Sequence, residues 1–574
     1  MAEFDRSAVM DLHAQLASRW SGRNGEYNLA RRRYHGDHWD PETNPAPSNR
    51  YSLTLNYLKP FVDKSVQLLV GRMPAIQVMP PGTQEEARRL AEQEEGILYG
   101  TWDANNAVEV FQQTAWDSFV LRRGLMYVWW DPGEEKVRFE NVAPEQFFPE
   151  YDGQKLYRAI YVQRRSTEAL KEEFPSYADD IWDDDAMNYP YVEGGDLDRR
   201  GAKGQTTVID LHCLDGWHYR VMGNAFVSQQ LTFPFKKKLP FIEFPCFPIS
   251  GETEPLNLID QLVELNQYVD QLVSQQADII SRYANPVVLD KASGQSAENI
   301  RRSMGAPGAV VPVKRDGNIE LLGWSGNTPA IEQQMTFAID ALFDLAGKPR
   351  SAFGQTVTNQ SGVVTNLALT PTLQSNEQHE SIWGQRLAEL NEWILGLWEK
   401  NMSGSRINMK GRYASQTGST KYYDVQITGS EIDGWYKNRI KWPSAIRTDD
   451  PVYIQNNLSQ LTSNPPAISL YTYLERVGTE DVEAEIDRIQ EQLEDPRLNP
   501  AGLESMANVA GTMQQNALPP GDPMNGFAPD AGIGGGGMAG VGPGSGPGNG
   551  LVDALTSGGN PNRDSMAKAL KPGG

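Results

Sequence analysis

At 574 residues the chain is too long for one hydrophobic core, so several sub-domains are expected. Its 74 acidic and 52 basic residues give a net charge of −22, which excludes a protein that coats DNA with basic side chains but not one that guides DNA. Cys213 and Cys246 are the only cysteines, too few for a disulfide framework or a thiolate zinc site, and a reducing intracellular origin is expected. A charged N-terminus and the lack of long apolar runs predict a protein that neither follows the signal-peptide route nor spans a membrane.

The N-terminal part is predicted to be mainly helical. Apolar spacing predicts one helix over residues 6–34 and another from about Asn56, with Gly71 as its stop signal. Residues 83–121 are rich in good helix formers and are predicted to form two further helices. A helical layer therefore precedes any sheet.

Strand patterns follow this helical layer. Residues 124–150, 156–166 and 207–230 are rich in β-branched and aromatic residues and are separated by turn signals, so they predict antiparallel strands. Between them, the acid-rich residues 177–198 include the run from Asp183 to Asp185 and are interpreted as a solvated loop.

A long helix is predicted from about Pro255 to Ala284, with a length of roughly 45 Å at 1.5 Å per residue. One side carries an apolar seam, and a stripe within about 80° carries only carboxylates and amides. The stripe consists of Asp260, Glu264, Gln267, Gln271, Gln275 and Asp278. Such a stripe is commonly just a solvated face, but residues 259–280 contain no Lys or Arg and so forgo every stabilising i,i+4 ion pair.

A second acidic helix is predicted to begin at Thr328, with Pro329 in its first turn and Gly347 at its end. Its only charged residues are Glu332, Asp340 and Asp344. Two neighbouring helices of this kind suggest a wall that repels a polyanion.

Short strands are expected at residues 285–291, 308–314 and 318–324 between these two helices. A long helix over residues 363–400 should be kinked at Pro371. Acidic helices split at Gly478 follow, and the Gly- and Pro-rich sequence from about Leu518 is predicted to be disordered because it cannot offset its ordering entropy.

Some acidic and histidine residues also fit catalytic or metal-binding alternatives. A metal-dependent nuclease could use Asp260, Glu264 or the Asp183 run, but residues spaced regularly along a helix do not converge on one point. His35 and His38 could hold a metal only with further ligands, and none lie nearby in the sequence. No P-loop, GxSxG or HExxH motif is present, so we predict neither an enzyme nor a cofactor or metal site.

The order of these blocks resembles the portal proteins of tailed double-stranded DNA bacteriophages. The resemblance covers most of residues 30–495 and rests on four blocks. They are "YHGDHW" with "NRYSLTLNYLKPFVDKSVQLLVGRMPAI", "PLNLIDQLVELNQYVDQLVSQQADIISRYANPVVLDK", "AIEQQMTFAIDALFDLAGKPRSAFG" with "NQSGVVTNLALTPTLQ", and "ISLYTYLERVGTEDVEAEIDRIQEQ". The clip is short for this family, and the Gly-rich tail is absent from many relatives.

The resemblance implies an α+β portal-protein fold with long stem helices, a small β-containing clip, a mixed α/β wing and a helical C-terminal crown. The expected boundaries are wing 1–254, stem helix 255–285, clip 286–326, second stem helix 327–347, tunnel loop 348–361, long kinked helix and wing completion 362–445, crown 446–515 and disordered tail 516–574.

The same resemblance implies a ring of twelve copies at one vertex of the virion capsid, assembled in the host cytoplasm. Its implied partners are double-stranded DNA passing through without sequence specificity, the terminase large subunit, a head-tail adaptor, and major capsid and scaffold proteins. The polar stripe and the three acids of the second helix would line the DNA channel, and Lys314 and Arg315 of the clip would dock partners. The tunnel loop would contribute Lys348, Arg350, Gln355, Thr356, Thr358, Asn359 and Gln360. Another head-tail connector or scaffold ring is the alternative, although adaptors are usually much shorter chains.

Overall fold

A computed structural model describes residues 4–41, 44–46, 51–71, 73–82, 84–153, 155–184, 204–231, 233–235, 237–284, 287–291, 294, 296–304, 314–316, 318–322, 328–353, 362–414, 420–442, 451–463, 467–477, 485–486 and 488–490. The chain divides into two compact units, Met1–Arg488 and Ile489–Gly574. The helices and strands named below all lie in the first unit. The chain is mixed helix and strand, as the α+β expectation requires.

Helices form the N-terminal layer where apolar spacing predicts them. They are α1 (Arg6–Tyr34), α2 (Leu58–Val70), α3 (Glu85–Ala104) and α4 (Ala107–Val120). Asp5 caps α1 by accepting the backbone N–H of Ala8 at 2.7 Å, and the last turn of α1 carries three arginines that favour the negative end of the helix dipole.

Two antiparallel sheets follow this helical layer. Their strands are β2 (Arg123–Asp131), β3 (Lys136–Asn141), β4 (Phe147–Asp152), β5 (Lys155–Ser166), β6 (Gln205–Cys213), β7 (Trp217–Met222), β8 (Ala225–Gln230) and β9 (Phe241–Pro245), with the short helix α5 (Thr167–Glu173) after β5. One sheet has the order β3-β2-β9 and the other the meander β4-β5-β6-β7-β8. Short 3₁₀ turns occupy Pro144–Gln146, Pro175–Tyr177, Arg350–Phe353 and Gly429–Ile432.

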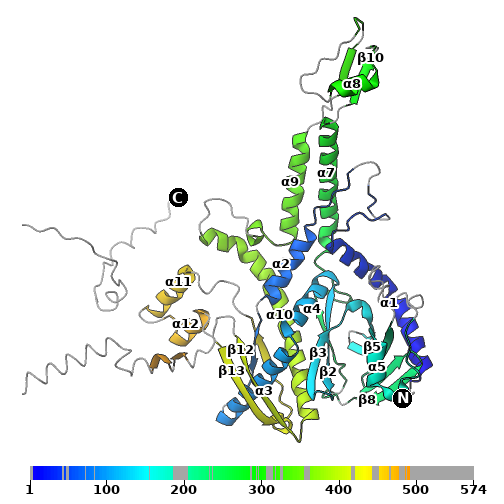
Figure 1. The fold of residues 1–574 in the computed structure, drawn as a ribbon. Coiled ribbons are helices and arrows are strands. Elements are labelled where there is room, and N and C mark those ends of the chain that lie inside the picture. Colours follow the sequence, from blue (N-terminus) through cyan, green and yellow to red (C-terminus); the bar gives the residue numbers. More distant parts are fainter. Residues whose placement is uncertain are drawn as a thin grey trace, which may run out of the picture. The chain divides into compact units, whose positions relative to one another are not determined.

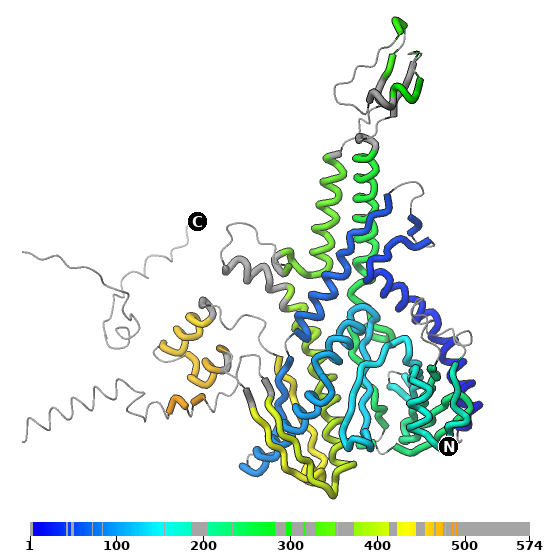
Figure 2. Tube along the Cα trace, viewed as in Figure 1, coloured from blue at the N-terminus to red at the C-terminus, as the bar shows by residue number. Residues whose placement is uncertain are grey.

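Two helices then run side by side, α7 (Asp260–Ala284) and α9 (Thr328–Leu345) (Figures 1 and 2). The segment between them contains β10 (Val287–Lys291), α8 (Ala297–Met304) and β11 (Asn318–Leu322). Strands β10 and β11 pair antiparallel, with Val287 opposite Leu322. Helix α8 was not foreseen from the sequence, and the strand expected at residues 308–314 lies outside the described residues except for Lys314.

The later part of the chain completes the N-terminal layer. Its elements are α10 (Gly362–Asn401), β12 (Arg406–Ala414), β13 (Thr420–Thr428) and β14 (Asn438–Lys441). Strand β14 pairs antiparallel with β1 (Ala75–Val78), so residues more than 350 positions apart share one small sheet. Pro371 lies within the continuous helix α10.

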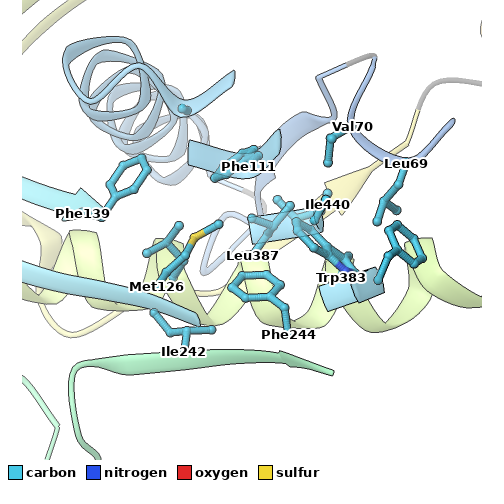
Figure 3. Close-up of a cluster of buried hydrophobic side chains, with 14 of the residues drawn as sticks. Leu69, Val70, Phe111, Met126, Phe139, Ile242, Phe244, Trp383, Leu387 and Ile440 are labelled. Carbon is cyan, nitrogen blue, oxygen red and sulfur yellow. The ribbon is translucent and has the colours of Figure 1, made fainter. Parts of the chain in front are cut away.

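The largest core forms where α10 crosses the three-stranded sheet (Figure 3). Trp383 and Leu387 of α10 are buried there beside Phe244 of β9, and the rings of Phe244 and Trp383 are 4.5 Å apart. Full burial of aromatic side chains of this size is worth roughly 1.5–3 kcal/mol each. This core fixes the base from which α7 and α9 extend, because Leu258, Leu262 and Leu342 belong to the same cluster.

Helices α11 (Pro451–Leu461) and α12 (Leu470–Val477) follow β14. They fall in the region expected to form the crown, but the rest of that region beyond Gln490 lies outside the described residues. The Gly- and Pro-rich tail expected over 516–574 also lies outside them.

Candidate DNA-channel surface

The polar stripe predicted on the long helix is present on α7, and its middle is open to solvent. Glu264, Gln271 and Gln275 are exposed, and Gln267 is half-buried. The opposite, apolar side, including Leu262 and Val269, is buried in the main core. A row of carboxylate and amide oxygens and amide N–H groups can therefore face a large solute without offering it a cation.

The two ends of the stripe are held by the rest of the chain. Arg122 donates to Asp260 at 3.1 Å and also pairs with Glu26 at 2.8 Å. At the other end, Asp278 accepts the backbone N–H of Tyr51 at 3.1 Å. Both carboxylates are thus bonded to other parts of the same chain, which the sequence did not reveal.

A second polar row on α7 was missed by the sequence reasoning. Backbone N–H groups of an extended segment, residues 51–57, donate to side-chain oxygens placed one helical turn apart. The bonds are Tyr51 to Asp278 (3.1 Å), Leu53 to Ser274 (2.9 Å), Leu55 to Asp270 (2.7 Å) and Tyr57 to Asn266 (3.0 Å). Alternate residues of a strand are about 6.6 Å apart, and positions i and i+4 of a helix are about 6 Å apart, so the two repeats match.

The sequence did carry a signal for this clamp. Residues 51–57 read "YSLTLNY", a strict alternation of apolar or aromatic and polar residues that predicts an extended chain. Asn266, Asp270, Ser274 and Asp278 share the i,i+4 spacing of one helix face. Neither pattern alone indicates that residues 51–57 contact this face of the helix.

Asp270 is also the buried partner of His38. His38 Nδ1 lies 2.6 Å from Asp270 Oδ2, and both side chains are excluded from solvent. The other ring nitrogen of His38 lies 3.0 Å from the carbonyl oxygen of Arg33. Both nitrogens of His38 are therefore occupied, which leaves neither to ligate the metal considered for this motif. Across the described residues, no group of three or more His, Cys, Asp or Glu side chains is arranged to hold a metal ion.

On α9, the three predicted acidic residues Glu332, Asp340 and Asp344 are all exposed. Arg350, just beyond the helix, donates to Asp340 at 2.6 Å and stacks over the ring of Phe343 at 5.1 Å. Arg350 is thus engaged within the chain.

Lys348, expected at the start of a DNA-contacting loop, lies inside the protein with 8 % of its surface exposed. Burial lowers the pKa of Lys348 to about 8, with the Cys246 thiol nearby. Burial, reinforced by the Lys348 charge, also lowers the pKa of His379 to about 4. Lys348 therefore acts here as a buried group between α9 and α10 and is not presented to solvent.

The other tunnel-loop residues, Gln355, Thr356, Thr358, Asn359 and Gln360, lie outside the described residues. Lys314 and Arg315 are described and exposed, between α8 and β11. Two exposed cations side by side can accept an acidic surface of another protein.

Asp183 and Asp184 cap a loop, and Asp185 of the same run lies outside the described residues. Asp183 accepts the hydroxyl of Thr167 at 2.6 Å and the N–H of Gly204 at 3.1 Å, and these bonds lower its pKa. Asp184 accepts the backbone N–H of Thr207. Carboxylates committed to loop hydrogen bonds do not form the shared metal site that nuclease chemistry needs.

A pocket of about 530 Å³ lies between α2 and α4, lined in part by Asp63, Trp116, Asp117 and Asn141. Burial raises the pKa of Asp117 to about 8, and Asn141 donates to it at 2.7 Å. Asp63, the other carboxyl group of this lining, accepts the hydroxyl of Tyr34 at 2.6 Å and pairs with Lys59 at 2.9 Å. Both carboxyl groups of the pocket are thus engaged within the chain. Among the described helices, none combines the length and the apolar character needed to cross a bilayer.

The family described as "Phage portal protein, SPP1 Gp6-like" matches residues 14–496, which covers α2 to α12 and most of α1. A search of curated proteins found no significant match.

Proposed function

This chain belongs to the SPP1 Gp6-like family of phage portal proteins, and we propose that it forms a dodecameric ring at one capsid vertex that serves as the channel for DNA packaging and ejection. The family is structural rather than catalytic, and it implies a ring subunit located at the capsid vertex.

The exposed, cation-free stripe on α7 carries this proposal. Double-stranded DNA bears one negative charge per about 1.7 Å of its axis, so lysines or arginines on the wall would hold it by phosphate contacts. Glu264, Gln271 and Gln275 offer no such contacts. Glu264 and Gln275 are exposed and would face the bore, and Gln271 is exposed but donates to Asn44 at 3.3 Å. In this arrangement α7 forms the lining, Asp260 and Asp278 anchor its two ends, and Glu332, Asp340 and Asp344 of α9 stand at its margin.

The tunnel loop would supply the weak, sequence-independent DNA contact in this proposal. Because Lys348 is buried and Arg350 is paired with Asp340, the loop offers DNA chiefly the amides and hydroxyls of residues 355–360. Neutral donors of this kind contact phosphates without holding them strongly.

Partner docking is proposed at the segment between α7 and α9. Lys314 and Arg315 would receive acidic groups of the terminase large subunit during packaging and of the head-tail adaptor afterwards. Contacts with major capsid and scaffold proteins would fall on the N-terminal layer.

A charge-reversal experiment tests the lining. We expect the triple variant Glu264→Lys, Gln271→Lys and Gln275→Lys to form normal rings and procapsids but to package DNA several-fold more slowly, with the defect larger at low salt. The matched control is Glu109→Lys, Gln112→Lys and Gln113→Lys, which makes the same substitutions on the exposed face of α4.

Three outcomes decide the proposal. Slow packaging by the α7 variant alone supports the lining. Equal packaging by both variants would remove α7 from the channel wall. The absence of rings in electron micrographs of the unmodified protein would reject the portal assembly itself.

A further inference from the structure

The 51–57 segment uses only one of its two hydrogen-bonding edges. Its odd-numbered N–H groups point toward α7, so the N–H groups of Ser52 and Thr54 point the other way. These two groups make no hydrogen bond with any residue that the structure describes. An open strand edge is a template for pairing with another surface.

The same segment also exposes an apolar row. Tyr51, Leu53 and Leu55 are 49 %, 40 % and 39 % exposed. They lie on one face of the segment, as alternate residues of an extended chain do. The segment thus presents unpaired donors and apolar side chains together, the two features that mark a surface awaiting a partner.

The outer side of α9 repeats the features by which α7 holds this segment. Glu332 and Thr336 are exposed and carry side-chain oxygens one helical turn apart. Asp270 and Ser274, which are buried under the 51–57 segment on α7, have the same spacing. Beside them, Phe337 is 68 % exposed and is among the most exposed large apolar residues described. A helix with this pattern is suited to receive a second edge of the same strand.

The two surfaces lie at matching heights along the α7/α9 pair. Within one chain, Tyr57 contacts Phe343 of α9, with ring centres 6.3 Å apart, which sets a common level. From Tyr57, Thr54 is about 10 Å and Ser52 about 17 Å further along an extended chain. At 1.5 Å per residue, the same distances from Phe343 along α9 reach about Thr336 and about Glu332.

When the α7/α9 pair lies parallel to the ring axis, neighbouring copies are related by rotation about that axis. A given residue then lies at the same height along the axis in every copy. The Ser52 and Thr54 edge of one copy would therefore face Glu332 and Thr336 of the next copy, with Phe337 between Leu53 and Leu55. A head-to-tail ring requires two different, complementary patches on every subunit, and these two patches satisfy that requirement. The partial positive charge of the N–H groups also complements the negative charge of the acidic side chains of α9.

We propose that the outer edge of the 51–57 segment is a subunit contact that docks on α9 of the neighbouring copy. Ser52 N–H donates to Glu332 and Thr54 N–H to the Thr336 hydroxyl, while Phe337 packs between the two leucines. Each 51–57 segment then lies between two helices, α7 of its own chain and α9 of the next. This proposal rests on the ring of the proposed function and specifies how its subunits meet.

A cysteine pair tests the contact in the full-length protein. Thr54→Cys combined with Thr336→Cys should give, under mild oxidation, a ladder of covalent oligomers on non-reducing gels, since a disulfide needs Cα atoms about 4.4–6.8 Å apart. Each single-cysteine variant controls for Cys213 and Cys246. The pair Thr54→Cys with Asp344→Cys is the matched negative, because Asp344 lies two turns, about 12 Å, further along α9.

Electron micrographs of the same samples separate the possible failures. A ladder from the 54/336 pair only supports the contact. Intact rings without that ladder, or an equal ladder from the 54/344 pair, would overturn the contact while leaving the portal ring standing. Absence of rings in the unmodified protein would instead count against the proposed function.

A second variant addresses the apolar half of the contact without cysteines. Phe337→Asp should shift the protein from rings toward monomers in mass measurements, whereas Tyr422→Asp, at a somewhat more exposed aromatic on β13, should not. Ring formation by Phe337→Asp equal to that of the Tyr422→Asp control would contradict the role of Phe337.

Discussion

The backbone N–H of Leu55 donates to the Asp270 carboxylate at 2.7 Å, and through this bond an extended segment is fastened to a helix more than 200 residues later in the chain. The second oxygen of Asp270 is taken by His38 at 2.6 Å. One buried carboxylate thus fixes both the "YHGDHW" turn and the 51–57 segment against α7. Helix α7 consequently has two polar faces with different roles, one directed to solvent and one directed to its own chain.

Removing Asp270 should release this clamp. Asp270→Ala leaves the Leu55 N–H and His38 without their acceptor, and unpaired buried groups of this kind cost about 2–4 kcal/mol. We expect faster amide hydrogen exchange at residues 51–57 and early protease cleavage there. Glu264→Ala, at an exposed carboxylate on the same helix, should change neither, and equal protection in both variants would contradict the clamp.

Glu94 should make the chain less stable as the pH rises. It is buried, neither carboxylate oxygen has a hydrogen-bond partner among the described residues, and burial raises its pKa to about 8. The folded state therefore binds a proton more tightly than the unfolded state, so stability is full below the unfolded pKa near 4.5 and is lost as the pH rises toward 8.

Glu94→Gln should remove this dependence. At pH 8 we expect the variant to be more stable than the unmodified chain by about 1–3 kcal/mol, with little difference at pH 4.5. Urea midpoints at the two pH values measure this. Glu92→Gln, at an exposed residue of the same helix, serves as the control, and parallel pH profiles for all three proteins would refute the expectation.

Lys348 should oppose folding when it is charged. Burial lowers its pKa to about 8 from 10.5, so the unfolded state binds the proton more tightly and the stability of the chain rises with pH between these values. Lys348→Met should stabilise the chain by about 1–3 kcal/mol at pH 7, and the gain should shrink by pH 10. Lys410→Met, at an exposed lysine, is the control for thermal melting.

The same Lys348 variant separates a structural role from DNA contact. Because the side chain is buried, packaging by Lys348→Met should proceed at the rate of the unmodified ring. A packaging defect in rings of normal appearance would instead show that Lys348 leaves its buried position to reach DNA.

Asp210 should be essential to the five-stranded sheet. Arg220 donates to both its oxygens, at 2.6 and 3.1 Å, and His218 lies 3.1 Å away, an arrangement that holds the pKa of Asp210 well below its usual range despite burial. Asp210→Ala would remove the closest partner of Arg220 and the partner of the buried His218, at a cost of about 3–5 kcal/mol.

Glu173, the second carboxylate beside Arg220, provides the comparison. Glu173 approaches Arg220 at 3.7 Å from a more exposed position, and Glu173→Ala should cost less than about 1 kcal/mol. Thermal melting of both variants measures the difference. Similar losses of stability in the two variants would show that the Asp210–Arg220 pair stabilises the sheet no more than the Glu173–Arg220 pair does.

The sequence alone determined the main elements and their order. Apolar spacing located α1 within residues 6–34, Gly71 marked the end of α2, and the seam of Leu262 and Val269 fixed which side of α7 is buried. These features are local, because a helix repeat and a stop residue act within a few positions of one another.

Only the tertiary structure decided which polar groups remain open. The sequence assigned Asp278 and Lys348 to solvent-facing roles, but one accepts the Tyr51 N–H and the other is buried. Periodicity gives each helix its faces and says nothing about which distant segment covers them. That choice depends on long-range packing, which placed residues 51–57 on one polar face of α7 and left Glu264, Gln271 and Gln275 on the other.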